Sequence, residues 1–301
     1  MNFALLLEKW CGLSAGDPVV IVTDQKQNKL AETIARDIAG PCSVLLFEDG
    51  RRLMPEIKKL PPNHLLAALF SFDTYLNKGA NRVFSPFEKP KGVQAKYAFI
   101  RLDISEESLL QGLSTPKGLV YRTLSDLQTF PAGSVLRVTN AAGTDISLAI
   151  DRFTTCAHEI TIGGGMAFLP PSEASAVVLP GKASGLIAVD ITVGQLYLRG
   201  ELLGRFGLVD EPVRLTVAHG MATDIQGGAM AAELREKLFA LPPECRALVE
   251  LGHGLSEMAP TGLIGVDESI LHTCHFGFGD GGTCGVHLDV VISKPTITKT
   301  G

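Results

Sequence analysis

The chain has 301 residues, 46% of them hydrophobic and 20% charged, and its formal net charge is −5. This length suits one large or two ordinary domains, and we expect two. The charges form no basic stripe, which argues against DNA and RNA as partners, and no apolar run is long enough to span a membrane. The six cysteines show no CxxC spacing, which favours reduced thiols and a cytoplasmic location.

The first third of the chain alternates short apolar runs with amphipathic segments. Residues 18–23 form one such run, and residues 27–38 have the pattern of a helix that follows it. Further apolar runs lie at residues 42–47, 65–69 and 98–100. This alternation predicts a doubly wound parallel sheet. The first turn lacks the pattern Gly-x-Gly-x-x-Gly, so we expect no dinucleotide there.

Beyond about residue 120, short strand patterns are separated by Gly, Pro and Asn. Residues 137–146 predict a hairpin around Gly143, and residues 185–193 and 212–218 predict further strands. A helix is predicted at 229–239, because Leu234 and Leu238 continue an apolar stripe before two prolines. We therefore expect an N-terminal doubly wound α/β domain over residues 1–120 and a C-terminal mixed α+β metal-binding domain over residues 121–301.

The stretch from Glu250 to Asp289 concentrates residues that bind metals. His287 and Asp289 are two apart in a strand pattern, so both side chains project from the same face. The glycine-rich link at 277–282 can turn the chain so that His275 meets this pair. Glu250 can bring a carboxylate to the same point. Clustered histidines and carboxylates are typical ligands of zinc, cobalt, manganese or non-haem iron, so the sequence predicts a metal site.

Other residues of this kind have more ordinary interpretations. Cys274 and Cys284 flank the histidines, but small packing residues are the favoured interpretation for both. His272 should face away from His275 if the segment is extended, and His219 should lie in a turn after a strand.

Five motifs in order give the second half a resemblance to a known family. They are Val138-Thr139-Asn140 with Gly143-Thr144-Asp145, Leu169-Pro170-Pro171-Ser172-Glu173, Glu250-Leu251-Gly252, His275-Phe276-Gly277-Phe278-Gly279 and His287-Leu288-Asp289. Residues 120–292 resemble the thermophilic metalloaminopeptidases, the aminopeptidase T type of leucyl aminopeptidase, to which the 2,5-dihydroxypyridine 5,6-dioxygenases are related. The resemblance implies a homodimer and metal ligands at Glu173, Glu250, His275, His287 and Asp289.

The chain also departs from the peptidase pattern. The peptidases carry a tyrosine soon after the first histidine, whereas the last tyrosine here is Tyr197. The link between His275 and His287 is shorter than theirs, and Ser172 stands where they have glycine.

Three functions follow as hypotheses. The first is an aminopeptidase-like hydrolase with two zinc, cobalt or manganese ions, in which Glu173 carries a proton to the leaving amine of a peptide substrate. The second is an oxygenase with one iron(II), held by His287, Asp289 and either His275 or His253, acting on a small-molecule substrate. The third is a non-catalytic peptide-binding scaffold.

Overall fold

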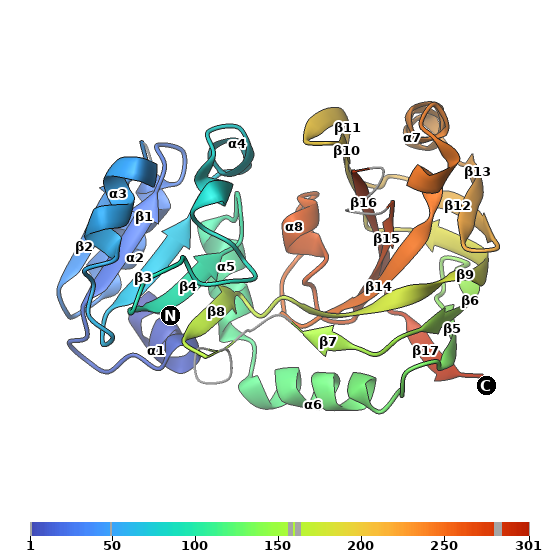
Figure 1. Cartoon of the computed structure of the whole chain (residues 1–301). Helices are drawn as coiled ribbons and strands as arrows, with labels where there is room; N and C mark the ends of the chain where they lie inside the picture. The colour runs from blue at the N-terminus through green and yellow to red at the C-terminus, as the bar shows by residue number, and fades with distance from the viewer. Residues whose placement is uncertain (1, 49, 156–158, 160–163, 280–284, 301) are drawn as a thin grey trace. The chain divides into compact units, whose positions relative to one another are not determined.

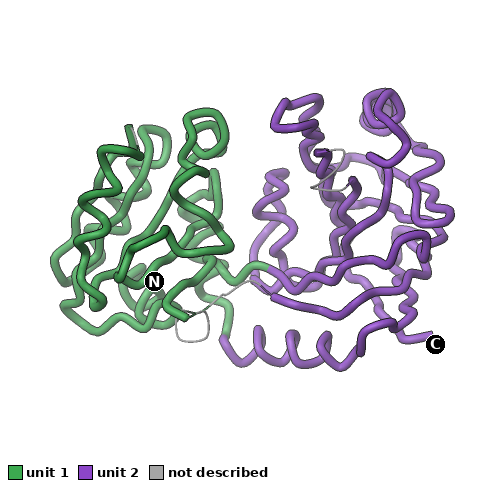
Figure 2. Tube along the Cα trace, viewed as in Figure 1, with its two compact units in different colours: residues 1–116, 156–172 green, residues 117–155, 173–301 purple. Residues whose placement is uncertain are grey.

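The computed structural model describes residues 2–48, 50–155, 159, 164–279 and 285–300. The chain divides into two compact units (Figure 2), one made of residues 1–116 and 156–172 and the other of residues 117–155 and 173–301. The first unit contains a parallel sheet and the second a large antiparallel sheet (Figure 1). The expected fold class, α/β with two domains of different character, is confirmed.

The first unit is built on a five-stranded sheet in the order β2-β1-β3-β4-β8, and its neighbouring strands pair in parallel. Its strands are β1 (Val19–Thr23), β2 (Cys42–Leu46), β3 (Leu65–Leu69), β4 (Lys96–Ile100) and β8 (Met166–Leu169). The order reverses between β1 and β3, as in doubly wound sheets. Residues of β1 and β3 are buried throughout, because helices cover both faces of such a sheet.

Helices connect these strands and complete the first core. They are α1 (Phe3–Cys11), α2 (Asn28–Asp37), α3 (Gly50–Ile57), α4 (Phe72–Leu76), the short 3-10 helix η1 (Ala80–Arg82) and α5 (Glu106–Ser114). Aromatic rings pack tightly here, with the centroids of Phe70 and Phe84 5.2 Å apart. The indole of Trp10, fully buried, donates to the carbonyl oxygen of Leu113 and so ties α1 to α5.

The strand β8 shows one difference from the expected division of the chain. The expected boundary near residue 120 places residues 156–172 in the second domain, whereas Met166–Leu169 pairs with β4 in parallel register. The chain therefore leaves the first unit, forms part of the second and returns to complete the parallel sheet. A parallel neighbour always needs such a crossover, and its sequence position cannot be read from local patterns.

The second unit contains a twelve-stranded sheet whose main path is β11-β10-β16-β15-β14-β9-β6-β5-β17. Its strands are β5 (Val135–Thr139), β6 (Asp145–Ile150), β7 (Thr154–Thr155), β9 (Glu173–Val189), β10 (Thr192–Leu198), β11 (Glu201–Leu208), β12 (Val213–Ala218), β13 (Met221–Gln226), β14 (Leu248–Gly254), β15 (Thr273–Phe278), β16 (Val286–Ser293) and β17 (Thr296–Lys299). Its neighbouring strands pair in antiparallel orientation.

The helices of the second unit are α6 (Lys117–Gln128), α7 (Ala229–Phe239), the 3-10 helix η2 (Pro243–Arg246) and α8 (Ile264–Asp267). The predicted hairpin is present as β5 and β6, and α7 covers the predicted residues with Leu234 and Leu238 buried. No helix in the described part of the chain is long and apolar enough to cross a membrane.

One predicted strand, at residues 185–193, is interrupted. β9 ends at Val189 and β10 begins at Thr192. Between them, the carboxylate of Asp190 accepts hydrogen bonds from the backbone nitrogen and the hydroxyl of Ser293, at 2.7 and 2.6 Å. These bonds hold the chain in a turn where the apolar pattern alone predicts a continuous strand.

Candidate metal centre

Four adjacent strands, β9, β14, β15 and β16, bring the predicted ligands onto one face of the antiparallel sheet. On β14, Glu250, Gly252 and Gly254 alternate and share a face. Glu173 pairs with Gly254, and His275 pairs with Gly252. Side chains of directly opposed residues project from the same face, so both lie on the Glu250 side of the sheet.

Asp289 reaches the same face through Gly277. Gly277 on β15 pairs with Glu250 on one side and with Asp289 on the other. His287 is two residues before Asp289 on β16 and therefore shares its face. All five predicted ligands thus project from one side of the sheet.

Two glycines, Gly252 and Gly277, provide the space in which the side chains of the candidate ligands lie. A Cβ atom on Gly252 would lie 1.9 Å from Cε1 of His275, so the imidazole ring lies over the backbone of β14. A Cβ atom on Gly277 would lie 2.9 Å from Cβ of Glu250 and 3.1 Å from Oδ1 of Asp289. Any larger residue at either position would push the ligand candidates aside, and glycine within a strand often marks such a close approach.

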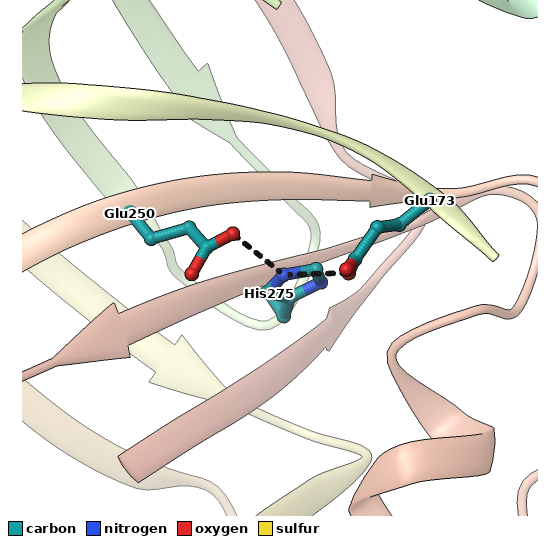
Figure 3. A group of neighbouring side chains, drawn as sticks. All are labelled: Glu173, Glu250 and His275. Carbon is teal, nitrogen blue, oxygen red and sulfur yellow. Dashed lines mark ion pairs between the residues drawn. The ribbon is translucent and has the colours of Figure 1, made fainter. Parts of the chain in front are cut away.

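The first ligand group consists of Glu173, Glu250 and His275 (Figure 3). Nε2 of His275 lies 3.1 Å from Oε2 of Glu173 and 4.0 Å from Oε1 of Glu250. The side chain of His275 is 2% exposed, against 16% for Glu173 and 26% for Glu250. The imidazole is thus enclosed between two carboxyl groups from neighbouring strands.

The second ligand group consists of Glu250, His287 and Asp289. Nε2 of His287 lies 2.8 Å from Oδ2 of Asp289. His287 is 50% exposed and Asp289 only 9%, so this group is the more open of the two. Within each group, one ligand atom per residue lies within 4.8 Å of the others, and Glu250 belongs to both groups.

The charges around the site raise the pKa values of both histidines. Burial lowers the pKa of His275, but the charge of Glu173, a hydrogen bond with Glu250 and the charge of Asp289 outweigh it and raise the pKa to about 10. The charge of Asp289 and its hydrogen bond raise the pKa of His287 to about 9. Burial raises the pKa of Glu250, but His275 and a hydrogen bond with Ser175 lower it to about 2. The carboxylates around His275 and His287 therefore favour positive charge at this position, which protons on the two imidazoles supply here.

The residues of the site fit a divalent ion. Nδ1 of His275 and Oδ1 of Asp289 are buried and have no hydrogen-bond partner among the described residues. Buried polar atoms without a partner are rare in native proteins, and a bound ion can satisfy them. Two imidazoles and three carboxyl groups are ligands that zinc, manganese, cobalt and iron all accept.

His253 lies apart from both groups. It stands between Gly252 and Gly254 on β14 and pairs with Cys274, so its side chain projects from the opposite face of the sheet. Its Nδ1 lies 2.8 Å from the carbonyl oxygen of Gly254, and burial lowers its pKa to about 4. The structure therefore does not place this alternative ligand with Glu250, because the two differ by an odd number of strand positions.

The remaining candidates also lie away from the ligand groups. Cys274 shares the face of His253, and burial raises the pKa of its thiol. His272 is exposed in a turn with φ of 63°, and His219 lies in a turn with φ of 50°. Cys284 and residues 280–282 of the glycine-rich link lie outside the described residues.

Two neighbours of the site were missed by the sequence reasoning. Ser175 donates a hydrogen bond to Glu250, and the charge of Glu268 contributes to the raised pKa of His287. Ser175 follows Glu173 by two positions, so strand alternation places both on one face. For Glu268 the sequence carries no comparable signal, because it lies in the segment after α8.

A family model matches the middle of the chain. The model of 2,5-dihydroxypyridine 5,6-dioxygenase (NicX) covers residues 93–268, a stretch that includes Glu173 and Glu250 and ends before His275. No protein with a curated description matches the sequence.

Two solved structures share the fold. The 2,5-dihydroxypyridine dioxygenase from Pseudomonas putida KT2440 has 15% identity and a TM-score of 0.61, covering 99% of this chain and 92% of that chain. Wild-type AmpT from Thermus thermophilus has 13% identity and a TM-score of 0.56, covering 98% of this chain and 93% of that chain. At these identities the likeness is one of fold. Because the family model spans more than half of the sequence, the chain belongs to the 2,5-dihydroxypyridine 5,6-dioxygenase family.

Proposed function

We propose that this protein is a metal-dependent hydrolase that holds two divalent ions and cleaves a peptide or amide bond at the amino end of its substrate. The observation that carries the proposal is the position of Glu250, which belongs to two ligand groups, each with its own histidine. A carboxylate shared by two groups is the arrangement expected of a bridging ligand in a two-metal site.

The five candidate ligands would bind the two ions in two groups. Glu173 and His275 would hold one ion, His287 and Asp289 the other, and Glu250 would contact both. Zinc, cobalt or manganese ions at such a site supply water of near-neutral pKa and polarise a carbonyl group. The side chain of Glu173 is 16% exposed, whereas that of His275 beside it is 2% exposed. We assign Glu173 the transfer of a proton to the leaving amine, in line with general acid–base catalysis by carboxylates.

An exposed apolar side chain beside the candidate ligands, that of Val177, supports a substrate with an apolar residue next to the cleaved bond. Val177 on β9 pairs directly with Glu250, so it lies on the same face of the sheet. It is 60% exposed, although valine is normally buried in a strand. We infer that Val177 contacts the side chain of the substrate residue whose bond is cleaved.

A second candidate function is a mononuclear iron(II) oxygenase. The match to the family model of 2,5-dihydroxypyridine 5,6-dioxygenase favours it. His275, His287 and Asp289 would then provide the two histidines and one carboxylate of such a site, leaving positions for substrate and dioxygen. In the described geometry, however, His275 groups with Glu173 and Glu250 rather than with His287 and Asp289, which supports the hydrolase.

The metal content of the protein tests both candidates. Protein purified anaerobically without chelator is analysed for metals, and its turnover is measured on a panel of amino-acid amides and dipeptides and, by oxygen uptake, on 2,5-dihydroxypyridine. Two ions of zinc, cobalt or manganese with amide hydrolysis support the hydrolase. One tightly held iron with oxygen uptake supports the oxygenase, and absence of stoichiometric metal supports a non-catalytic scaffold.

A pair of histidine variants sharpens the result. His287→Gln removes a ligand that is 50% exposed, so the fold should remain while metal is lost. His253→Gln alters a histidine on the opposite face of the sheet and should retain all metal. Loss of iron from His253→Gln would contradict the hydrolase and support an oxygenase in which His253 is a ligand.

A further inference from the structure

The first unit contains a cavity of about 1000 Å³ beyond the carboxyl ends of two of its parallel strands. One wall is formed by Phe47, Glu48 and α3, which follow β2, and the other by the end of α4 and by η1, which follow β3. Both α3 and α4 lie in the upper part of this unit in Figure 1. Open α/β sheets bind small ligands beyond the carboxyl ends of their strands, and ligand cavities usually measure about 300–1,000 Å³. The place and the size of the cavity therefore suit a small molecule.

One side of α3 is turned to the cavity. The residues that line it follow the spacing i, i+3, i+4 and i+7, which marks one side of a helix, and they are Arg51, Met54, Pro55 and Lys58. The backbone nitrogen of Lys58 donates to the carbonyl oxygen of Met54, so the helical turn extends to Lys58. On another side of α3, Leu53 is buried in the core. The side that faces the cavity thus carries a cation at each end and apolar residues between them.

The opposite wall adds two more cations. Lys78 and Arg82 line the cavity from the segment that joins α4 to η1 and from η1 itself. A Cβ atom on Gly79 would lie 3.5 Å from Nε of Arg82, so the guanidinium group lies over the backbone next to Lys78. The two walls touch where a Cβ atom on Gly50 would lie 2.6 Å from Cγ2 of Val83. Cations from two walls therefore border a single cavity.

Few acidic groups balance these cations. Among the described residues that line the cavity, only Glu48 carries a carboxylate. Neither Lys58 nor Arg82 forms an ion pair with another described residue. Nζ of Lys78 lies 3.4 Å from Oδ2 of Asp73, but the two side chains are 65% and 59% exposed, and ion pairs so exposed contribute little. The excess of positive charge favours an anionic ligand.

Part of the lining is apolar. Phe47, Met54 and Val83 line the cavity and pack against the hydrophobic core of the first unit. The ring of Phe47 is held by Phe70 and Phe84, whose centroids lie 5.6 and 6.2 Å from its own. Apolar residues with a few charged groups are the usual lining of a small-molecule site. The ligand that matches this lining has an apolar body and an anionic group.

We propose that this cavity binds an organic phosphate, a small molecule with an apolar body whose phosphate group contacts cations of both walls. A phosphate group carries a charge of about −1.5 to −2 and three acceptor oxygens, so it can contact several cations at once. Arginine binds phosphates with a fork of donors, and lysine binds them as a point charge. The proposal does not rest on the hydrolase function, because the cavity lies in the first unit and the candidate metal centre in the second.

Four compounds separate the phosphate group from the apolar body. They are 1-naphthyl phosphate, 1-naphthoate, 1-naphthol and inorganic phosphate. Binding to the metal-loaded protein is measured by the fluorescence of the naphthyl group, and for inorganic phosphate by displacement of 1-naphthyl phosphate. We expect saturable binding of 1-naphthyl phosphate and binding of the other three that is at least about tenfold weaker. Absence of saturation below about 1 mM, or equal affinity for any of the other three, would overturn the proposal.

Charge variants test whether the cavity is the binding site. Arg82→Gln and Lys58→Gln each remove one cation, and each should weaken the binding of 1-naphthyl phosphate by about tenfold. Arg52→Gln is the matched control, because this exposed arginine lies on another side of α3 and lines a separate, smaller cavity. It should bind with the affinity of the wild type. Unchanged affinity in both Arg82→Gln and Lys58→Gln would overturn the proposal, as would an equal loss in Arg52→Gln.

The candidate metal centre is the other place where a phosphate group would bind, because divalent ions bind phosphates. His287→Gln should lose metal and still bind 1-naphthyl phosphate with the affinity of the wild type. Loss of binding in His287→Gln with unchanged binding in Arg82→Gln would assign the phosphate to the ions and overturn the proposal. If the protein hydrolyses no amide but Arg82→Gln weakens the binding as expected, the proposed function fails and the phosphate site stands.

Discussion

Gly252→Ala should displace His275 and remove metal from the first ligand group. The added Cβ would lie 1.9 Å from Cε1 and 2.1 Å from Nε2 of His275. Ordinary carbon contacts are about 3.5–4.0 Å, so the ring must move by roughly 1.5–2 Å. Such overpacking costs about 1–3 kcal/mol, and it moves Nε2 away from Glu173 and Glu250. The backbone of Gly252 is not left-handed, so the effect comes from the ring contact alone.

Two measurements check this prediction. Urea unfolding of the metal-free protein gives the free energy of unfolding, and elemental analysis gives the metal retained after dialysis. Gly118→Ala is the control, because its Cβ meets no atom within 4 Å and it lies in α6, where alanine is favoured over glycine by up to about 1 kcal/mol. Gly252→Ala with full metal content and a free energy within about 0.5 kcal/mol of the wild type would refute the reasoning.

Three further predictions follow from the second unit. The metal-free protein should lose stability as the pH rises from about 6.5 towards 10, because the folded pKa of His275 lies above the unfolded value and its contribution disappears through that range; equal urea midpoints at pH 6 and pH 10 would contradict this. Asp267→Ala should lower the free energy of unfolding by roughly 2–4 kcal/mol, because this fully buried carboxylate accepts four hydrogen bonds of 2.5 to 2.8 Å. A loss below about 1 kcal/mol in urea unfolding would contradict this prediction. Val177→Asp should raise KM for leucine p-nitroanilide by about tenfold while metal content stays unchanged, because it replaces an exposed apolar contact with a charge; an unchanged KM would remove Val177 from the substrate site.

Local patterns were sufficient for the elements whose own residues decide their form. The alternation of apolar runs and amphipathic segments predicted the parallel sheet of the first unit, and the apolar stripe around Leu234 predicted α7. Likewise, the spacing of His287 and Asp289 placed both side chains on one face of a strand, where their side chains lie 2.8 Å apart. In each case the relevant neighbours are only two to four residues apart in the chain.

Local patterns failed where a side chain of a neighbouring element decides the outcome. The apolar run at 185–193 continues through Asp190, but a hydrogen bond from Ser293 turns the chain there. β8 extends the parallel sheet although its sequence follows strands of the other unit. Neither feature can be predicted from the residues immediately around it.

The sequence by itself determined which residue types could bind a metal and which positions of one strand share a face. Only the tertiary structure decided which strands lie side by side and in what register. That register places Glu173 of β9 beside His275, whose ring lies over the backbone of Gly252. The physical reason is that the side-chain period of a strand is two, so a shift of one residue moves a ligand or a catalytic group to the opposite face.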